Sequence, residues 1–283
     1  MEPRQAAIET YRYLRVGIVA LALLLAMAVV GEIVVGDAGL LGSISAYYFT
    51  PVRDVFVGVL VALGLGLIVI RGRGVEDVLL NLAGMLAPVV AFVPTPVTDS
   101  VRSSLGSTPA PTADAMWALI ALGVPALAFA VATARRLDGD ARTAAMRGAA
   151  AGAITVVCFG AWLGIDDQSF LQAAHYAAAV GMFGVFVVVA RLNAVSARDD
   201  VEGPVVAMLP AQRRRTAYAT ISWSMLGTVV VAGLLGLLQL TGSTPVPHWL
   251  FWVESILLAL FAAFWALQTI EYWRDGVPLM DSD

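Results

Sequence analysis

Eight runs of apolar residues, each nearly as long as a membrane-spanning helix, constrain this chain more than any other feature. A helix needs about 20 apolar residues to cross about 30 Å of hydrocarbon, with a tolerance of a few residues either way. None of the runs alternates apolar and polar residues as the strands of a membrane barrel do. The sequence therefore predicts an all-α transmembrane helix bundle, a single membrane domain over residues 1–283. The expected spans are residues 16–35, 55–70, 78–93, 115–134, 149–165, 173–190, 217–240 and 250–270.

The composition supports this prediction and excludes several kinds of chemistry. Hydrophobic residues make up 59% of the chain and charged residues only 13%, about half the charged share of a soluble domain. All 17 basic residues are arginine, which excludes functions that need a lysine amine. The single cysteine, Cys158, excludes an intrachain disulfide and is expected to pack in an apolar run. No cofactor is predicted. Membrane lipids are the expected partners, and the absence of a basic, aromatic-rich cluster argues against nucleic acid.

The arginines predict the orientation of the chain, because loops that remain in the cytoplasm accumulate positive charge. With eight spans and the N-terminus inside, 15 of the 17 arginines fall on the cytoplasmic side, and only Arg53 and Arg102 fall outside. A count of seven or nine spans would scramble this division. We therefore expect a multi-pass protein of the plasma (inner) membrane with both termini in the cytoplasm.

In this orientation the polar residues at membrane depth collect on the outer side. The inner halves of the spans hold little beyond Asn81 and Gln268. An ionisable group within a span costs roughly 2.5 to 3.5 kcal/mol, so such groups tend to face a bundle interior or a watery cavity. Glu254, about four residues inside the last span, either reaches the interface or handles a ligand. The outer group comprises Glu32, Asp37, Ser43, Ser45, Arg53, Asp54, Asp166, Asp167, His175, His248 and Glu254.

The segment of residues 42–51 is unusual for an extracytoplasmic loop, because it is aromatic, rich in hydroxyl groups and barely charged. Such a segment either lies in the membrane interface as part of an aromatic belt or dips back into the bundle and lines a cavity. Asp54 follows it near the start of a helix, where a carboxylate is also favoured by the helix dipole. Helix capping and a ligand-binding role both remain open for Asp54.

Both histidines fall on the outer side, so a zinc site with an open position is one alternative. Its ligands would be His175, His248 and either Asp54 or Glu254. The chain has no HxxxH or HExxH motif, and His248 and Glu254, six residues apart, do not share a helix face. The three residues His175, His248 and Asp54 are therefore kept only as alternative metal ligands.

Residues 43–58, Ser-Ile-Ser-Ala-Tyr-Tyr-Phe-Thr-Pro-Val-Arg-Asp-Val-Phe-Val-Gly, resemble the signature of a bacterial family of multi-span membrane proteins, catalogued as domain of unknown function nine-nine-eight. Shorter matches follow at residues 81–84, 92–95, His175 and 251–254. The resemblance implies a six-span core with an inserted helical hairpin, the fourth and fifth spans. It supplies no activity. It does single out one set of residues, Ser45, Tyr47, Tyr48, Arg53, Asp54, His175 and Glu254.

The leading hypothesis is an outward-facing polar pocket that binds or moves a lipid or small polar ligand. Arg53 would pair with an anionic group, Asp54 and Glu254 would receive cations or hydroxyls, and the tyrosines would wall the site. One alternative is an intramembrane hydrolase, in which His175 is the base or a metal ligand and Ser45 or a metal-bound water is the nucleophile. Another is a structural membrane subunit whose polar residues pair among themselves.

Overall fold

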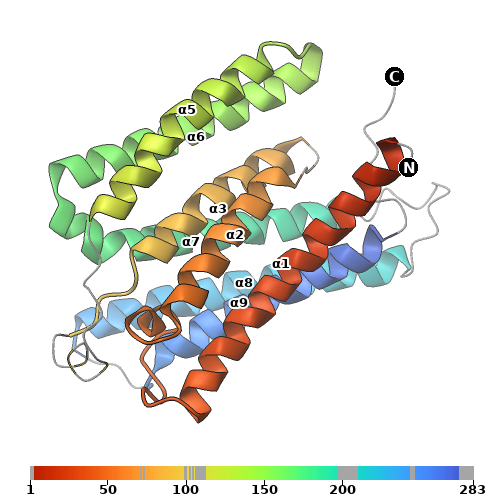
Figure 1. Cartoon of the computed structure of the whole chain (residues 1–283). Helices are drawn as coiled ribbons and strands as arrows, with labels where there is room; N and C mark the ends of the chain where they lie inside the picture. Colours follow the sequence, from red (N-terminus) through yellow and green to blue (C-terminus); the bar gives the residue numbers. More distant parts are fainter. Residues whose placement is uncertain are drawn as a thin grey trace. The chain divides into compact units, whose positions relative to one another are not determined.

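The computed structural model describes residues 3–70, 72, 74–98, 101, 103, 105, 113–196, 210–242 and 246–273. The regular structure of these residues is helical, with no strand, and it comprises eight long α-helices and one short 3₁₀ helix (Figure 1). The elements are α1 (Pro3–Val34), η1 (Ser45–Phe49), α2 (Arg53–Val69), α3 (Val75–Phe92), α5 (Ala113–Ala134), α6 (Gly139–Ile165), α7 (Asp167–Ser196), α8 (Ala211–Leu240) and α9 (Trp249–Glu271).

Each predicted span corresponds to one helix, which confirms the prediction of an all-α membrane bundle. Seven of the helices are long and apolar enough to cross a membrane. The eighth, α2, has 17 residues and is about 25 Å long, slightly short of the hydrocarbon thickness. Several helices extend beyond their apolar runs: α1 begins at Pro3 and α6 at Gly139. Alanine, arginine and glutamine are good helix formers, so the polar turns beside the runs remain helical.

The contacts of the chain fall into two compact units, and the expectation of a single membrane domain stays a prediction. Unit 1 comprises Met1–Ile44 and Phe183–Asp283, and unit 2 comprises Ser45–Met182. Helix α7 contributes to both, because the division falls between residues 182 and 183 within it.

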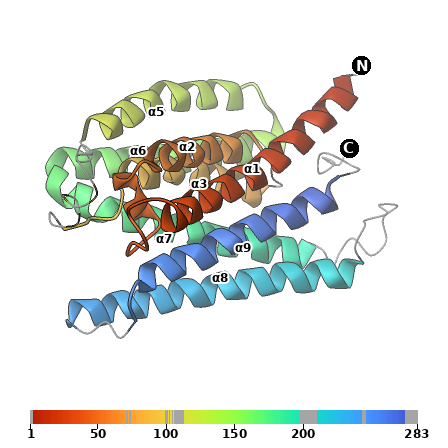
Figure 2. The same cartoon turned by 60° about the horizontal axis from the view of Figure 1, so that its bottom comes forward.

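In unit 1, α9 packs against both α1 and α8, and Figure 2 shows α8 and α9 running side by side. The core between α7 and α9 is aromatic. Phe186 of α7 meets the rings of Phe261 and Phe264 edge to face, with centroids 4.9 and 6.2 Å apart. Tyr218 of α8 adds a third contact, 5.6 Å from Phe264. Such aromatic pairs contribute about 0.5 to 1.5 kcal/mol each beyond the area that they bury.

In unit 2, α2 and α3 form a tightly packed antiparallel hairpin. A Cβ atom added to Gly64 would lie 2.6 Å from the backbone oxygen of Gly84, and one added to Gly84 would lie 2.6 Å from that of Gly64. Only glycine permits this approach, which is typical of helix pairs in membranes. The other hairpin, α5 with α6, packs against α3 mainly through α6.

The hairpin of α5 and α6 leaves many apolar side chains exposed, as surfaces that face lipid do. Phe129 of α5 is 75% exposed, and Val157 of α6 is 65% exposed. Cys158 is also exposed on α6, so the expectation that it packs within the protein is wrong. An apolar run in a membrane helix is apolar on every side, and the run alone does not show which side faces the protein.

Candidate functional site

The 3₁₀ helix η1 places the most distinctive part of the sequence inside the protein. All five of its residues are buried, and the side chains of Tyr47 and Tyr48 are 0% and 4% exposed. Thr50 closes the segment: its hydroxyl donates to the carbonyl of Tyr47 at 2.8 Å and accepts from the backbone of Val52 at 3.2 Å. The segment is thus buried within the protein and is not an aromatic belt at the membrane surface. Irregular backbone at membrane depth is tolerated where protein surrounds it or where it lines a cavity.

Ser45, Thr95 and His175 form a buried group of polar side chains in unit 2, here called the Ser45 cluster. The Ser45 hydroxyl hydrogen-bonds the Thr95 hydroxyl and also accepts from the backbone N–H of Thr95 at 3.2 Å. The Nδ1 atom of His175 lies 2.8 Å from the carbonyl oxygen of Val93, two residues before Thr95. Residues 93–95, just beyond α3, therefore hold side chains from both η1 and α7.

The hydrogen bond of His175 defines the chemistry of its ring. A carbonyl oxygen only accepts, so Nδ1 carries a proton, and in the neutral ring Nε2 then carries a lone pair. Such a nitrogen accepts a hydrogen bond from a ligand or takes a proton as a general base. The side chains of Ser45, Thr95 and His175 are 1%, 6% and 3% exposed, so this chemistry would take place away from bulk water.

Arg53 and Asp54 begin α2 directly after this segment. The guanidinium of Arg53 lies over the ring of Tyr48, 4.3 Å from its centroid, and its Nη2 atom donates to the Tyr48 hydroxyl at 2.6 Å. Asp54 is exposed in the first turn of α2, where a carboxylate is favoured by the helix dipole. The structure thus brings Arg53 to η1 through Tyr48 and leaves Asp54 at the surface.

Glu254, the seventh candidate, belongs to unit 1 and has a structural role there. Its carboxylate accepts a hydrogen bond from the backbone N–H of Ile44. Beside it, the N–H of Phe251 donates to the carbonyl of Gly42 at 2.9 Å, and the Nδ1 atom of His248 lies 3.1 Å from the carbonyl of Leu41. These contacts fix residues 41–44 to the start of α9. Among the described residues, no three His, Cys, Asp or Glu side chains are placed to hold a metal ion.

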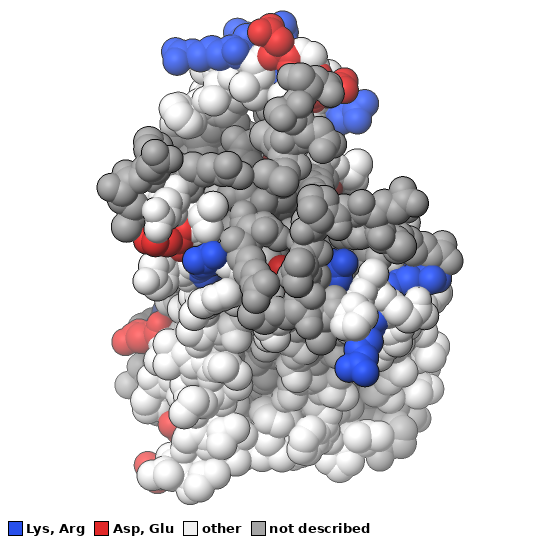
Figure 3. Space-filling model, turned by 90° about the vertical axis from the view of Figure 1, so that its right-hand side faces the viewer, with Lys and Arg blue, Asp and Glu red and all other residues white. Residues whose placement is uncertain are grey.

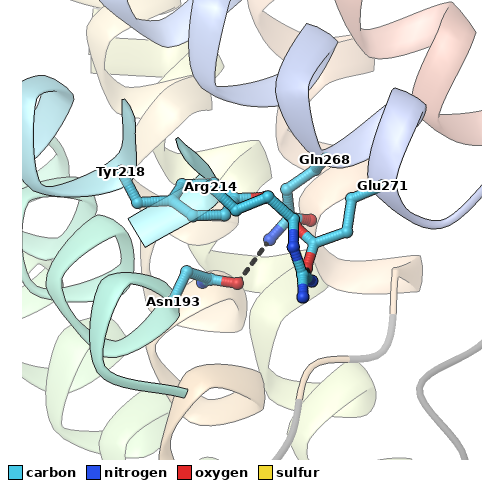
Figure 4. Close-up of polar contacts among 5 residues, drawn as sticks. All are labelled: Asn193, Arg214, Tyr218, Gln268 and Glu271. Atoms are coloured by element: carbon cyan, nitrogen blue, oxygen red, sulfur yellow. Dashed lines mark hydrogen bonds and ion pairs between the residues drawn. The ribbon is translucent and has the colours of Figure 1, made fainter. Parts of the chain in front are cut away.

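A second group of polar side chains lies at the other end of unit 1, and sequence reasoning missed most of it. Arg214 and Tyr218 of α8 both bind the carboxylate of Glu271, the last residue of α9. Next to them, the amide of Gln268 donates to Asn193 of α7 at 3.0 Å (Figure 4). These five residues, here called the Glu271 cluster, join the ends of three helices.

The Glu271 cluster was missed because most of its residues lie at or beyond the ends of the apolar runs, where polar residues are expected. A signal was nevertheless present. Arg214 and Tyr218 are four residues apart and Gln268 and Glu271 are three apart, so each pair lies on one helix face. Of the two inner residues that the sequence did single out, Gln268 belongs to the cluster. Asn81 instead donates to Asp77 of its own helix at 3.4 Å.

An apolar groove of about 470 Å³ lies between α8 and α9 in unit 1. Trp252, Ile256 and Val231 are among its lining residues, with Ser224 and Thr228 as polar members. The Thr228 hydroxyl donates to the carbonyl of Ser224 within α8 at 2.8 Å. None of the candidate residues lines this groove.

No family model matches the chain, and neither a curated protein nor a solved structure shows a significant match to it. The resemblance of residues 43–58 to domain of unknown function nine-nine-eight stays a prediction.

Proposed function

We propose that this protein binds or moves a lipid headgroup or a small polar ligand at the Ser45 cluster, with Arg53, which contacts Tyr48 of the same segment, contributing a positive charge. The observation that carries the proposal is the burial of Ser45, Thr95 and His175 together, each at most 6% exposed. A buried polar group costs about 1 to 3 kcal/mol unless it is hydrogen-bonded. The hydrogen bonds within the cluster offset this cost, and the same hydroxyl and imidazole groups are suited to bind a polar ligand.

The functional groups suit a ligand that carries both hydroxyl and anionic groups. The hydroxyls of Ser45 and Thr95 donate and accept, and Nε2 of His175 accepts in the neutral ring. The planar guanidinium of Arg53, held on the Tyr48 ring, matches the geometry of a phosphate or carboxylate. A phospholipid headgroup combines these features and is abundant where membrane helices end.

The binding test uses purified full-length protein in detergent and a fluorescent phosphatidylethanolamine, with fluorescence anisotropy as the measurement. His175→Gln and Arg53→Gln are each expected to weaken binding at least tenfold. His248→Gln, which changes the second of the two histidines, is the matched control and should bind as the wild type does. Equal affinity of all four proteins would contradict the proposal, provided that their thermal unfolding midpoints agree.

The same labelled lipid separates binding from hydrolysis. Ser45 and His175 both contact residues 93–95, so a serine hydrolase is the second candidate. Thin-layer chromatography after prolonged incubation should show intact lipid only. A labelled cleavage product that is formed by the wild type and lost in Ser45→Ala would replace the binding proposal with the hydrolase.

The proposal places the protein in the plasma (inner) membrane with both termini in the cytoplasm and the Ser45 cluster on the outer side. Two observations support this orientation. Arginines lie at the start of α1 and of α8, and the described residues at the other end of unit 1 include no arginine. In a Cys158→Ser background, a membrane-impermeant maleimide applied to intact cells should label Asp37→Cys and not Arg213→Cys. The reverse pattern would show the opposite orientation.

A further inference from the structure

Two arginines of α1 are stacked on two consecutive aromatic rings at the end of α9. The guanidinium carbon of Arg15 lies 4.6 Å from the ring centroid of Tyr272, and that of Arg12 lies 5.6 Å from the ring of Trp273. Arg15 is 2% exposed, whereas Trp273 is 43% exposed. The stacked pair, Arg12 and Arg15, thus extends from the protein interior to its surface.

Among the described residues, arginines outnumber acidic side chains at this end of unit 1. The described side chains there include six arginines and only two glutamates, and one of these glutamates, Glu271, is bound by Arg214. The opposite end carries three acidic groups and no arginine among the described residues. The charged residues of the first end are Glu9, Arg12, Arg15, Arg191, Arg213, Arg214, Arg215 and Glu271, and those of the second are Glu32, Asp37 and Glu254. An anion complements the arginines described at the first end.

The stacking orients the two guanidinium groups for an anion. A guanidinium that lies over a ring uses its face for the ring and keeps its N–H edge for oxygen atoms. Each group has five N–H donors, so contacts within the protein and contacts with a ligand are compatible. Three residues of helix rise about 4.5 Å, so Arg12 and Arg15 can reach oxygens of a single phosphate.

The position of the pair beside the first apolar run indicates that the phosphate belongs to a lipid. The first apolar run begins at residue 16, directly after Arg15, so the pair lies where the hydrocarbon begins. Tyrosine and tryptophan favour the same level, that of the lipid headgroups. Figure 3 views the face on which α1 begins and shows several separate arginine side chains on it, drawn in blue, together with acidic side chains in red.

From this geometry we infer that Arg12 and Arg15, with Tyr272 and Trp273, form a binding site for the phosphate of an anionic phospholipid headgroup. The site lies at the opposite end of unit 1 from residues 41–44 and does not depend on the proposed function of the Ser45 cluster. It predicts a lipid that stays bound to the purified protein.

The test counts the lipids bound to detergent-purified full-length protein by native mass spectrometry, during titration with phosphatidylglycerol or with zwitterionic phosphatidylcholine. Wild-type protein should bind one phosphatidylglycerol at least tenfold more tightly than phosphatidylcholine. The double variant Arg12→Gln/Arg15→Gln should lose this preference. The matched control Arg213→Gln/Arg215→Gln removes two charges from the same end and should keep it.

Three results would overturn the inference. Equal loss in both double variants would show diffuse attraction to a charged surface. Full competition by inorganic phosphate at the concentration of the lipid would show a soluble anion as the ligand. If the first double variant does not fold, two single variants that keep the positive charge replace it. Arg15→Lys removes the planar guanidinium, and Tyr272→Leu removes the aromatic ring beneath it. Unchanged lipid preference in both would exclude the stacked site.

Discussion

Arg214 and Glu271 form a buried ion pair that ties the first turn of α8 to the last residue of α9. Their side chains are 6% and 8% exposed, and the Tyr218 hydroxyl donates to the second carboxylate oxygen of Glu271. With the neighbouring bond between Gln268 and Asn193, the pair closes one end of unit 1. Removing one charge of such a pair leaves the other buried and uncompensated, which is more harmful than removing both.

Glu271→Gln is therefore expected to lower the free energy of unfolding by about 3 kcal/mol, because Arg214 loses its counter-ion. The double variant Arg214→Gln/Glu271→Gln should be less destabilised than the two single variants added together. SDS-titration unfolding in mixed micelles measures these differences. The same substitution at Glu9, a half-buried residue of α1, is the control and should cost less than about 1 kcal/mol. Strict additivity in the double variant would argue against a coupled pair.

Gly64→Ala and Gly84→Ala are each expected to destabilise the protein by about 1 to 3 kcal/mol, because the added methyl group would meet backbone on the facing helix. Gly58→Ala, on the same helix α2, is the matched control, since nothing lies within 4 Å of its added Cβ. That change should alter stability by less than about 1 kcal/mol. Thermal unfolding in detergent ranks the three variants, and a control as unstable as Gly64→Ala would refute the explanation by close approach.

Glu254→Ala is expected to cost about 1 to 3 kcal/mol, because the buried N–H of Ile44 loses its acceptor. Glu254→Gln keeps an oxygen at the same place and should cost less. Ser255→Ala, which removes a hydroxyl that donates to Phe251 of its own helix, serves as a comparison with little expected effect. If Glu254→Gln is as destabilised as Glu254→Ala, the charge of Glu254 matters more than its hydrogen bond.

Phe186→Ala should cost about 3 to 5 kcal/mol of unfolding free energy, because it leaves a cavity beside Phe261 and Phe264. Phe129→Ala removes the same ring from a site that is 75% exposed, where lipid or detergent fills the space. Its cost should be below about 1 kcal/mol. Chemical unfolding of the two variants side by side measures the contrast. Similar losses of unfolding free energy would mean that other protein covers the ring of Phe129.

The sequence predicted all eight helices because a membrane span requires a long apolar run, which is a property of neighbouring residues. Helix ends were less accurate, since α1 and α6 continue through polar turns that membrane length alone does not require. The contact of Ser45 with Thr95 joins residues 50 positions apart. No local spacing predicts such a partner. Cys158 was misplaced for a related reason: periodicity does not separate the lipid-facing side of a span from the packed side.

The reciprocal contact of Gly64 and Gly84 has an evolutionary consequence. Because each added Cβ would lie 2.6 Å from a backbone oxygen of the facing helix, no substitution of a side chain elsewhere makes room for it without moving a helix. The two positions are therefore constrained together, and a larger residue at one gives no freedom to the other. In homologous chains that keep this hairpin, we expect both positions to hold glycine even where the apolar residues around them vary.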